Sequence, residues 1–176
     1  MPTAVSDNTL SKCPLFRGMS SAERDEFIPL LEGKSYGPGA TIIHEGESQQ
    51  HIWIILKGRC HVTKKAKSGD EKELWILEPS GIFGEMSFFN PGPHSATVQA
   101  ITEAEVLHLS REKFDQLLRH GSVAAYKLAF NTMGVLIERL RKMDDWIAER
   151  MERNSAPVHH EEWRDFHAKL YTGWTF

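Results

Sequence analysis

The residues best suited to chemistry lie in one run near the middle of the chain, FGEMSFFNPGPHSATVQA, from Phe83 to Ala100. Gly84 has no side chain, so its backbone can approach an oxyanion closely. A short helix beginning at Glu85 would direct its unpaired N–H groups and positive dipole end toward the same anion. The run therefore predicts a strand, a glycine turn, a short helix and a returning strand around a phosphate group.

Other side chains of this run would suit a sugar phosphate. The Glu85 carboxylate can accept a hydrogen bond from a sugar hydroxyl, and Ala96 keeps the returning strand small where a ligand would lie. An acidic residue in a first helical turn is also favourable without any ligand, so Glu85 alone does not decide the function. The candidate binding residues are Gly84, Glu85, Met86, Ser87, His94, Ser95, Ala96 and Thr97.

The surrounding sequence indicates a small β domain. Between Ser35 and Leu109, short β-rich runs alternate with turn signals such as Lys57-Gly58, at spacings of about ten residues. That spacing is typical of an all-β sandwich or barrel. The run His51 to Leu56 is apolar on both faces of the pleat, as expected of a strand that is covered on both sides.

Helices are predicted on both sides of this β region. Ser20 and Glu23 form a capping-box pattern that begins a short helix. Ser110 begins another helix, which Gly121 ends. The first helix would present an apolar stripe made of Phe27, Leu30 and Leu31.

A longer helical pattern follows over residues 122–153. Its apolar residues keep the four-three rhythm of a coiled-coil seam, which predicts a homodimer. The alternative is a single amphipathic helix that lies on its own β domain. The predicted seam consists of Leu136, Leu140, Met143 and Ile147, preceded by Ala129 and by Met133 or Thr132.

Three further motifs accompany the central run: Pro14 to Ser20, Glu45-Gly46-Glu47, and Lys57-Gly58 after an apolar strand. Together these motifs resemble the cyclic nucleotide-binding domain superfamily, which includes catabolite-activator-type regulators, protein kinase A regulatory subunits and some ion channels. The resemblance covers roughly residues 15–151. The positions that the family holds most constant fall on Gly46, Gly58, Gly84, Glu85 and Ala96.

The resemblance implies an α+β fold: an antiparallel, jelly-roll-like β-roll with flanking helices and a long C-terminal dimerisation helix. We expect a flexible arm over residues 1–12, the cyclic nucleotide-binding-type β-roll over 13–121, the dimer helix over 122–153, and a linker with an aromatic tail over 154–176. The tail would pack on the protein itself, cover the ligand cavity or bind a partner.

One residue departs from the family pattern, because Pro93 is followed by His94 where relatives have arginine. Arginine donates two parallel hydrogen bonds to the cyclic phosphate, whereas imidazole is shorter and mostly neutral at pH 7. Losing such a partner costs on the order of 2–5 kcal/mol, or roughly 30- to 3,000-fold in affinity. Binding through a protonated His94 should strengthen as the pH falls from 8 to 6.

Three functions therefore stay open at this stage. The first is a regulatory module that senses a cyclic mononucleotide (cAMP or cGMP, bound weakly because of His94) or a related effector and signals through an unknown protein partner. The second is a ligand-independent dimeric scaffold with a degenerate pocket. The third is a haem or redox sensor, although the two cysteines, Cys13 and Cys60, are far apart in the sequence.

Composition and missing motifs narrow the remaining classes. With 21 basic and 24 acidic residues, the chain has no bulk attraction to nucleic acid or membranes. It carries no signal peptide, no spanning segment and no enzyme signature, which predicts a cytoplasmic protein that is not an enzyme. About twenty residues follow the long helix, too few for a helix-turn-helix module, so we expect no DNA binding. No metal site is predicted.

Overall fold

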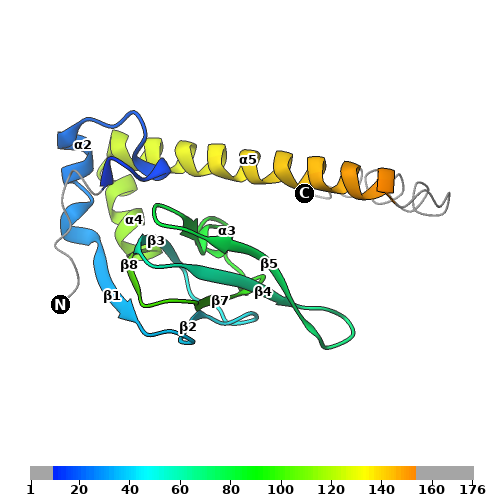
Figure 1. Ribbon diagram of the computed structural model, residues 1–176. Helices are drawn as coiled ribbons and strands as arrows, with labels where there is room; N and C mark the ends of the chain where they lie inside the picture. Colours follow the sequence, from blue (N-terminus) through cyan, green and yellow to red (C-terminus); the bar gives the residue numbers. More distant parts are fainter. Residues whose placement is uncertain (1–9, 154–176) are drawn as a thin grey trace. The chain divides into compact units, whose positions relative to one another are not determined.

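The computed structural model describes residues 10–153 of the chain (Figure 1). The predicted tail over residues 154–176 and most of the predicted arm lie outside the described residues. The chain divides into two compact units, Met1–Met133 and Gly134–Phe176. The first unit contains all of the strands described below, and each unit is described by itself.

Two four-stranded antiparallel sheets form the centre of the first unit within the described residues. One sheet has the strand order β1-β8-β3-β6 and the other has the order β2-β7-β4-β5. The predicted β-roll is therefore confirmed. The strands are β1 Glu32–Tyr36, β2 Thr41–Ile43, β3 His51–Lys57, β4 Cys60–Lys65, β5 Glu71–Leu77, β6 Ile82–Phe83, β7 Thr97–Ala100 and β8 Ala104–Ser110.

The inner faces of the two sheets pack against each other. Trp53 and Val106 from one sheet join Val62 and Val98 from the other in a single buried cluster. As predicted from its sequence, β3 is covered on both faces, because Ile52 and the alternating Trp53 are both almost fully buried. This two-sided burial makes β3 the central strand to which the candidate site is attached.

The helices before and after the sheets begin largely where capping residues predict them. Ser20 caps α2, Ser21–Asp25, through the predicted capping box with Glu23. Ser110 caps α4, Arg111–Arg119. The helix after Ser20 is shorter than predicted, since the stripe residues Phe27 and Leu30 lie around a separate 3-10 turn, η2 Ile28–Leu30, that contains Pro29. Proline lacks an N–H donor and disrupts an α-helix interior.

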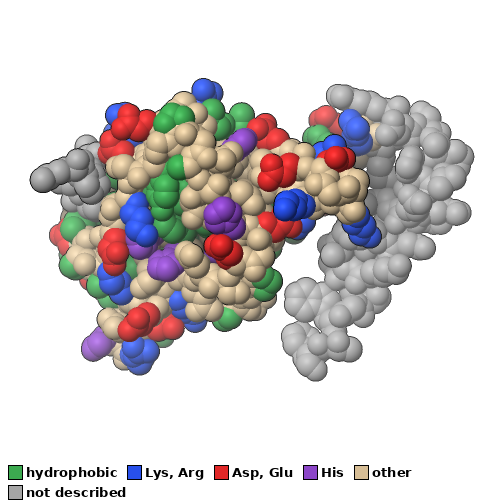
Figure 2. Space-filling model, turned by 90° about the horizontal axis from the view of Figure 1, so that it is seen from below, with side chains coloured by type: hydrophobic (Ala, Val, Ile, Leu, Met, Phe, Trp, Pro, Cys, Tyr) green, Lys and Arg blue, Asp and Glu red, His purple; other side chains and the backbone are tan. Residues whose placement is uncertain are grey.

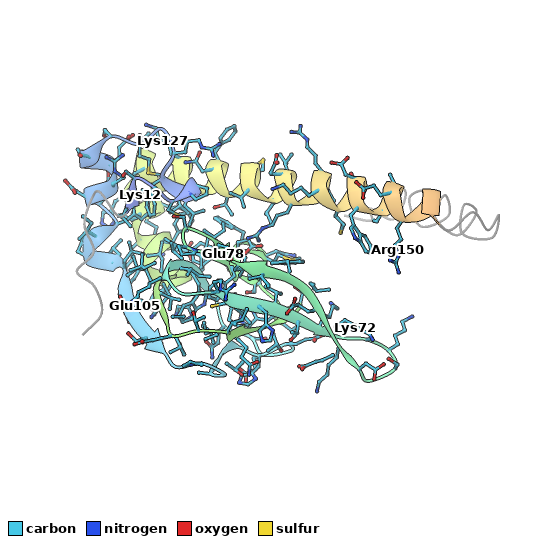
Figure 3. The ribbon with its side chains drawn as sticks, in the orientation of Figure 1. Lys12, Lys72, Glu78, Glu105, Lys127 and Arg150 are labelled. Atoms are coloured by element: carbon cyan, nitrogen blue, oxygen red, sulfur yellow. The ribbon has the colours of Figure 1, made fainter. Side chains whose placement is uncertain are left out.

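The long helix α5, Val123–Arg153, begins in the first unit, where its first turns are fastened to the N-terminal segment. Asn131 donates to the carbonyls of Leu15 and Arg17, each at 2.9 Å. Lys127, labelled in Figure 3, forms an ion pair with Glu23 of α2. Within residues 10–153, no helix is both long enough and apolar enough to cross a membrane.

One glycine fixes how β3 and β4 connect to the rest of the roll. Gly58 has φ +83°, and a Cβ placed there would lie 2.1 Å from the Glu103 carbonyl oxygen. Gly69, in the turn between β4 and β5, has a similar φ of +90°, but a Cβ placed there would meet nothing within 4 Å. Substitutions at the two glycines therefore distinguish the cost of left-handed backbone strain from the cost of a steric clash.

We predict that Gly58→Ala lowers the free energy of unfolding by about 3 kcal/mol or more, since alanine adds both left-handed strain and a steric clash. The matched variant Gly69→Ala adds only the strain, which costs about 1–2 kcal/mol. Urea denaturation followed by tryptophan fluorescence measures both values. Equal losses would contradict the close approach of Gly58 to Glu103.

Candidate functional site

The run from Phe83 to Ala100 folds as a strand, a turn, a helix and a returning strand. β6 ends at Phe83, Gly84 has φ +77°, and α3, Glu85–Phe89, begins immediately after it. A Cβ at Gly84 would lie 2.5 Å from the His51 carbonyl oxygen and 2.9 Å from Trp53 Cδ1. Glycine is therefore required both for the turn and for the contact with β3.

His94 lies inside this arrangement. Its side chain is only 6% exposed, and its Nδ1 is 2.9 Å from the Ser87 hydroxyl oxygen on α3. Its backbone exchanges hydrogen bonds with the preceding turn, donating to the Glu47 carbonyl at 2.8 Å and accepting from the Gly46 amide at 2.9 Å. The structure thus joins Gly46 to His94, at the position where the resemblance implies arginine.

The Ser87 hydroxyl controls the tautomer of this histidine. It can also donate to the carbonyls of Gly84 and Gln49, at 3.2 and 3.3 Å. When it does so, His94 Nδ1 carries the proton and Nε2 is an acceptor; when it donates to Nδ1 instead, Nε2–H is a donor. In the described part of the chain, His94 Nε2 is buried and has no hydrogen-bond partner. Only the tautomer with its proton on Nε2 can donate a hydrogen bond from that buried nitrogen to an anion.

The charge of His94 is determined by its surroundings. Burial lowers its pKa below the ordinary value, while the nearby Glu47 carboxylate opposes this shift and His51 adds to it. The side chain is therefore neutral at pH 7. Any gain in affinity from a protonated His94 begins at a lower pH than the sequence alone suggests.

The other predicted site residues lie in different environments. Glu85 and Ser87 are buried beside Gly84 and His94. Met86 points outward and is 58% exposed, with its sulfur 3.7 Å from the Ser95 hydroxyl. Ala96 packs against the core cluster between the sheets. Thr97 is engaged elsewhere, because its hydroxyl accepts a hydrogen bond from the Glu45 amide at 3.1 Å.

Two neighbours of this site are absent from the predicted set. Lys64 Nζ on β4 donates to the Ser95 carbonyl at 2.8 Å. The Glu45 carboxylate accepts from the Lys65 amide at 2.9 Å. The alternation along β4 places Lys64 on the same side as Val62, and Lys64 is exposed, as expected of a lysine near the end of a strand.

A second cluster of rings lies behind Gly84 on the inner face of β3 and β8. The rings of His51 and His108 are 5.0 Å apart, and His108 lies 4.6 Å from Trp53. Lys34 lies 5.5 Å from the centre of the Trp53 ring, and Glu32 Oε2 is 3.6 Å from His108 Nε2. On the face shown in Figure 2, several histidine side chains likewise lie among acidic and basic ones, beside a strip of hydrophobic residues.

The described residues give little support to a haem, metal or redox sensor. In residues 10–153, no group of three or more His, Cys, Asp or Glu side chains is placed to hold a metal ion. Cys13 and Cys60 are both buried. Burial raises the pKa of the Cys13 thiol to about 12 and that of Cys60 to about 11. Neither is a reactive thiolate at neutral pH.

The family model of the cyclic nucleotide-binding domain matches residues 33–121. The chain therefore belongs to the cyclic nucleotide-binding domain family. The match includes Gly46, Gly58 and the whole run from Phe83 to Ala100.

Several characterised relatives show how widely this domain is used. The chain is 31% identical over 131 residues to the cyclic AMP receptor protein of Thermus thermophilus, covering 74% of this chain and 59% of that one. It is 32% identical over 112 residues to the cAMP-dependent protein kinase regulatory subunit of Yarrowia lipolytica, covering 64% and 29%. The chain thus spans less than two thirds of these relatives.

Solved structures agree on the fold. The catabolite activator protein of Thermus thermophilus superposes with a TM-score of 0.68 at 30% identity, covering 77% of this chain and 62% of that one. A cyclic nucleotide-binding domain from Methylobacillus flagellatus gives a TM-score of 0.76 at 22% identity, covering 85% and 88%. At that identity the second match shows the fold alone.

The buried histidine of the second cluster gives a test of the inner face. Burial, then the positive charges of Lys34 and His51, lower the pKa of His108 to about 4, and Glu32 opposes them in part. The folded state therefore binds fewer protons than the unfolded state between about pH 6.5 and pH 4. Stability contributed by neutral His108 is fully present above pH 6.5 and is lost as the pH falls toward 4.

We predict that His108→Phe removes roughly 3 kcal/mol of this acid-induced loss of stability, since phenylalanine cannot be protonated. Denaturant titrations at intervals from pH 7 to pH 4 measure the effect. His44→Phe serves as the control, because His44 is exposed. A wild type and a His108→Phe variant with the same pH dependence would contradict the burial of a neutral imidazole.

Proposed function

We propose that this chain is a regulatory module that binds cAMP or a closely related cyclic mononucleotide in its β-roll and signals to a partner protein. The observation that carries this proposal is the arrangement of residues 83–100, called the cassette below: Gly84 turns in the left-handed region against β3, and the buried Glu85 begins α3 beside it. Its named relatives are regulators that respond to cAMP. We propose a regulatory, non-enzymatic role here as well.

Binding of this kind would be weaker than in relatives with arginine. A cyclic phosphate is a monoanion, and the His94 side chain that faces the cassette helix is neutral at pH 7. A solved structure at 26% identity and a TM-score of 0.58 is the regulatory subunit of a cAMP-independent protein kinase A from Trypanosoma brucei. A variant of that subunit with three substitutions, one of them threonine to arginine, is bound to cAMP.

A shift of α3 on ligand binding would be transmitted to the rest of the chain through α4. Arg111 at the start of α4 donates to the Phe88 carbonyl at the end of α3 at 2.8 Å, and it pairs with Asp115 at 2.7 Å. The rings of Phe88 and Phe114 pack 5.3 Å apart. A displacement of α3 would therefore move α4, which leads directly into α5.

A ligand-independent dimeric scaffold is the second candidate, and α5 favours it. Exposed apolar side chains repeat along this helix at four-three spacing, and one of them, Phe130, is 73% exposed. The exposed stripe consists of Tyr126, Phe130, Met133, Ile137 and Leu140. It shares Met133 and Leu140 with the seam predicted from sequence, and Met143 is exposed as well. We propose that a second copy of the chain covers this stripe in either case.

The pocket is tested by restoring the family residue. We predict that His94→Arg raises cAMP affinity by about tenfold or more, because a guanidinium adds a permanent charge and two parallel donors. Isothermal titration calorimetry measures it. His44→Arg, which adds the same charge at an exposed position before the Glu45–Glu47 turn, is the control. If the His94→Arg variant binds no cyclic nucleotide, the pocket is closed and the scaffold is favoured.

The dimer is tested at Leu140, which belongs both to the exposed stripe and to the predicted seam. We predict that Leu140→Glu converts a dimer into a folded monomer in light scattering, since two facing glutamates would cost several kcal/mol in a desolvated seam. Lys142→Glu is the matched control, because residue 142 lies about 200° around the helix from residue 140. A wild type that is monomeric at micromolar concentration would exclude the dimer.

A further inference from the structure

Lys64 is an exposed residue near the end of β4. Along β4, Cys60 and Val62 point between the sheets and belong to the buried core, and alternation directs Lys64 to the same side. The strand pairs Val62 with Val98 and Thr63 with Thr97. The next step of this register sets Lys64 opposite Ala96, the small residue that borders the predicted ligand position.

The side chain of Lys64 is directed at the cassette itself. Its ammonium donates to the Ser95 carbonyl at 2.8 Å, one residue after His94. An ammonium has three N–H donors, so this contact takes only part of its capacity. Lys65, the next residue, reaches the Glu45 carboxylate through its backbone amide instead. Of these two adjacent lysines, Lys64 therefore directs its ammonium at the cassette, whereas the contact of Lys65 is made by its backbone.

Two acidic side chains border the cassette. Glu85 is buried at the start of α3, and the Glu47 carboxylate is close enough to His94 to influence its pKa. His94 is neutral at pH 7 and adds no positive charge there. Arg111 contacts the opposite end of α3, at Phe88, and is paired with Asp115. Of Lys64 and Arg111, Lys64 is therefore the better placed for an anion beside Ser95 and His94.

We propose that Lys64 supplies from β4 the positive charge that arginine supplies in relatives, and that it binds the phosphate of a cyclic mononucleotide. This inference rests on the proposed function. Lysine is a compact point charge, without the planar fork of arginine. Recognition through Lys64 therefore depends on the ligand's charge more than on its shape, and the affinity falls more steeply with added salt than in the His94→Arg variant.

The test is a cycle of four proteins: wild type, Lys64→Gln, His94→Arg and the double variant, each titrated calorimetrically with cAMP and with uncharged adenosine. We expect Lys64→Gln to weaken cAMP binding by about tenfold in wild type and by less than about threefold in the His94→Arg background, since the arginine then carries the phosphate. Adenosine binding should not change. Lys65→Gln is the control and should leave cAMP affinity within about twofold.

The outcomes distinguish failure of the proposed function from failure of the proposed role of Lys64. If neither wild type nor His94→Arg binds cAMP, the proposed function fails and the role of Lys64 fails with it. If wild type binds cAMP and Lys64→Gln binds it equally well, the function stands and the role of Lys64 is overturned. Equal losses for cAMP and adenosine, or equal losses in both backgrounds, would also overturn it, because Lys64 would then only fasten the strand that begins at Thr97.

Discussion

The contact between Gly84 and β3 is the constraint on which the site depends. The backbone of Gly84 approaches the His51 carbonyl and the Trp53 ring so closely that no side chain fits between them. This approach requires both the positive φ and the absence of a Cβ. It ends β6, begins α3 and fixes the position of the α3 N–H groups relative to the inner face of the roll. Of the histidines on that face, His108 is buried and His51 is partly buried.

The protonation states of two histidines follow from this packing. Close packing removes water from His94 and His108, and both imidazoles have lowered pKa values as a result. A buried neutral histidine, where the family resemblance implies arginine, adds no positive charge for an anion. The register between β4 and β7 brings the Lys64 ammonium to the Ser95 carbonyl, beside His94. In our proposal, Lys64 supplies this missing charge.

Local signals in the sequence predicted much of this structure, and long-range register explains what they missed. The glycine at 84 and the caps at Ser20 and Ser110 act over a few residues, so the turn and helix starts could be predicted. The cluster of His51 and His108 depends on pairing between strands far apart in the chain. The rhythm along α5 fits two overlapping stripes that share Met133 and Leu140, and only burial of the first turns shows which side chains stay exposed.

The central claim is that a cyclic mononucleotide binds at the start of α3. Two-dimensional amide spectra of ¹⁵N-labelled wild-type protein, titrated with cAMP up to about 10 mM, test it most directly, because even weak binding shifts the amides that hold the ligand. The account predicts saturable shifts at Gly84, Glu85 and Ser95, with little change at the distant Gly69. Cassette amides that stay unchanged over the whole titration, while the protein remains folded, would contradict it.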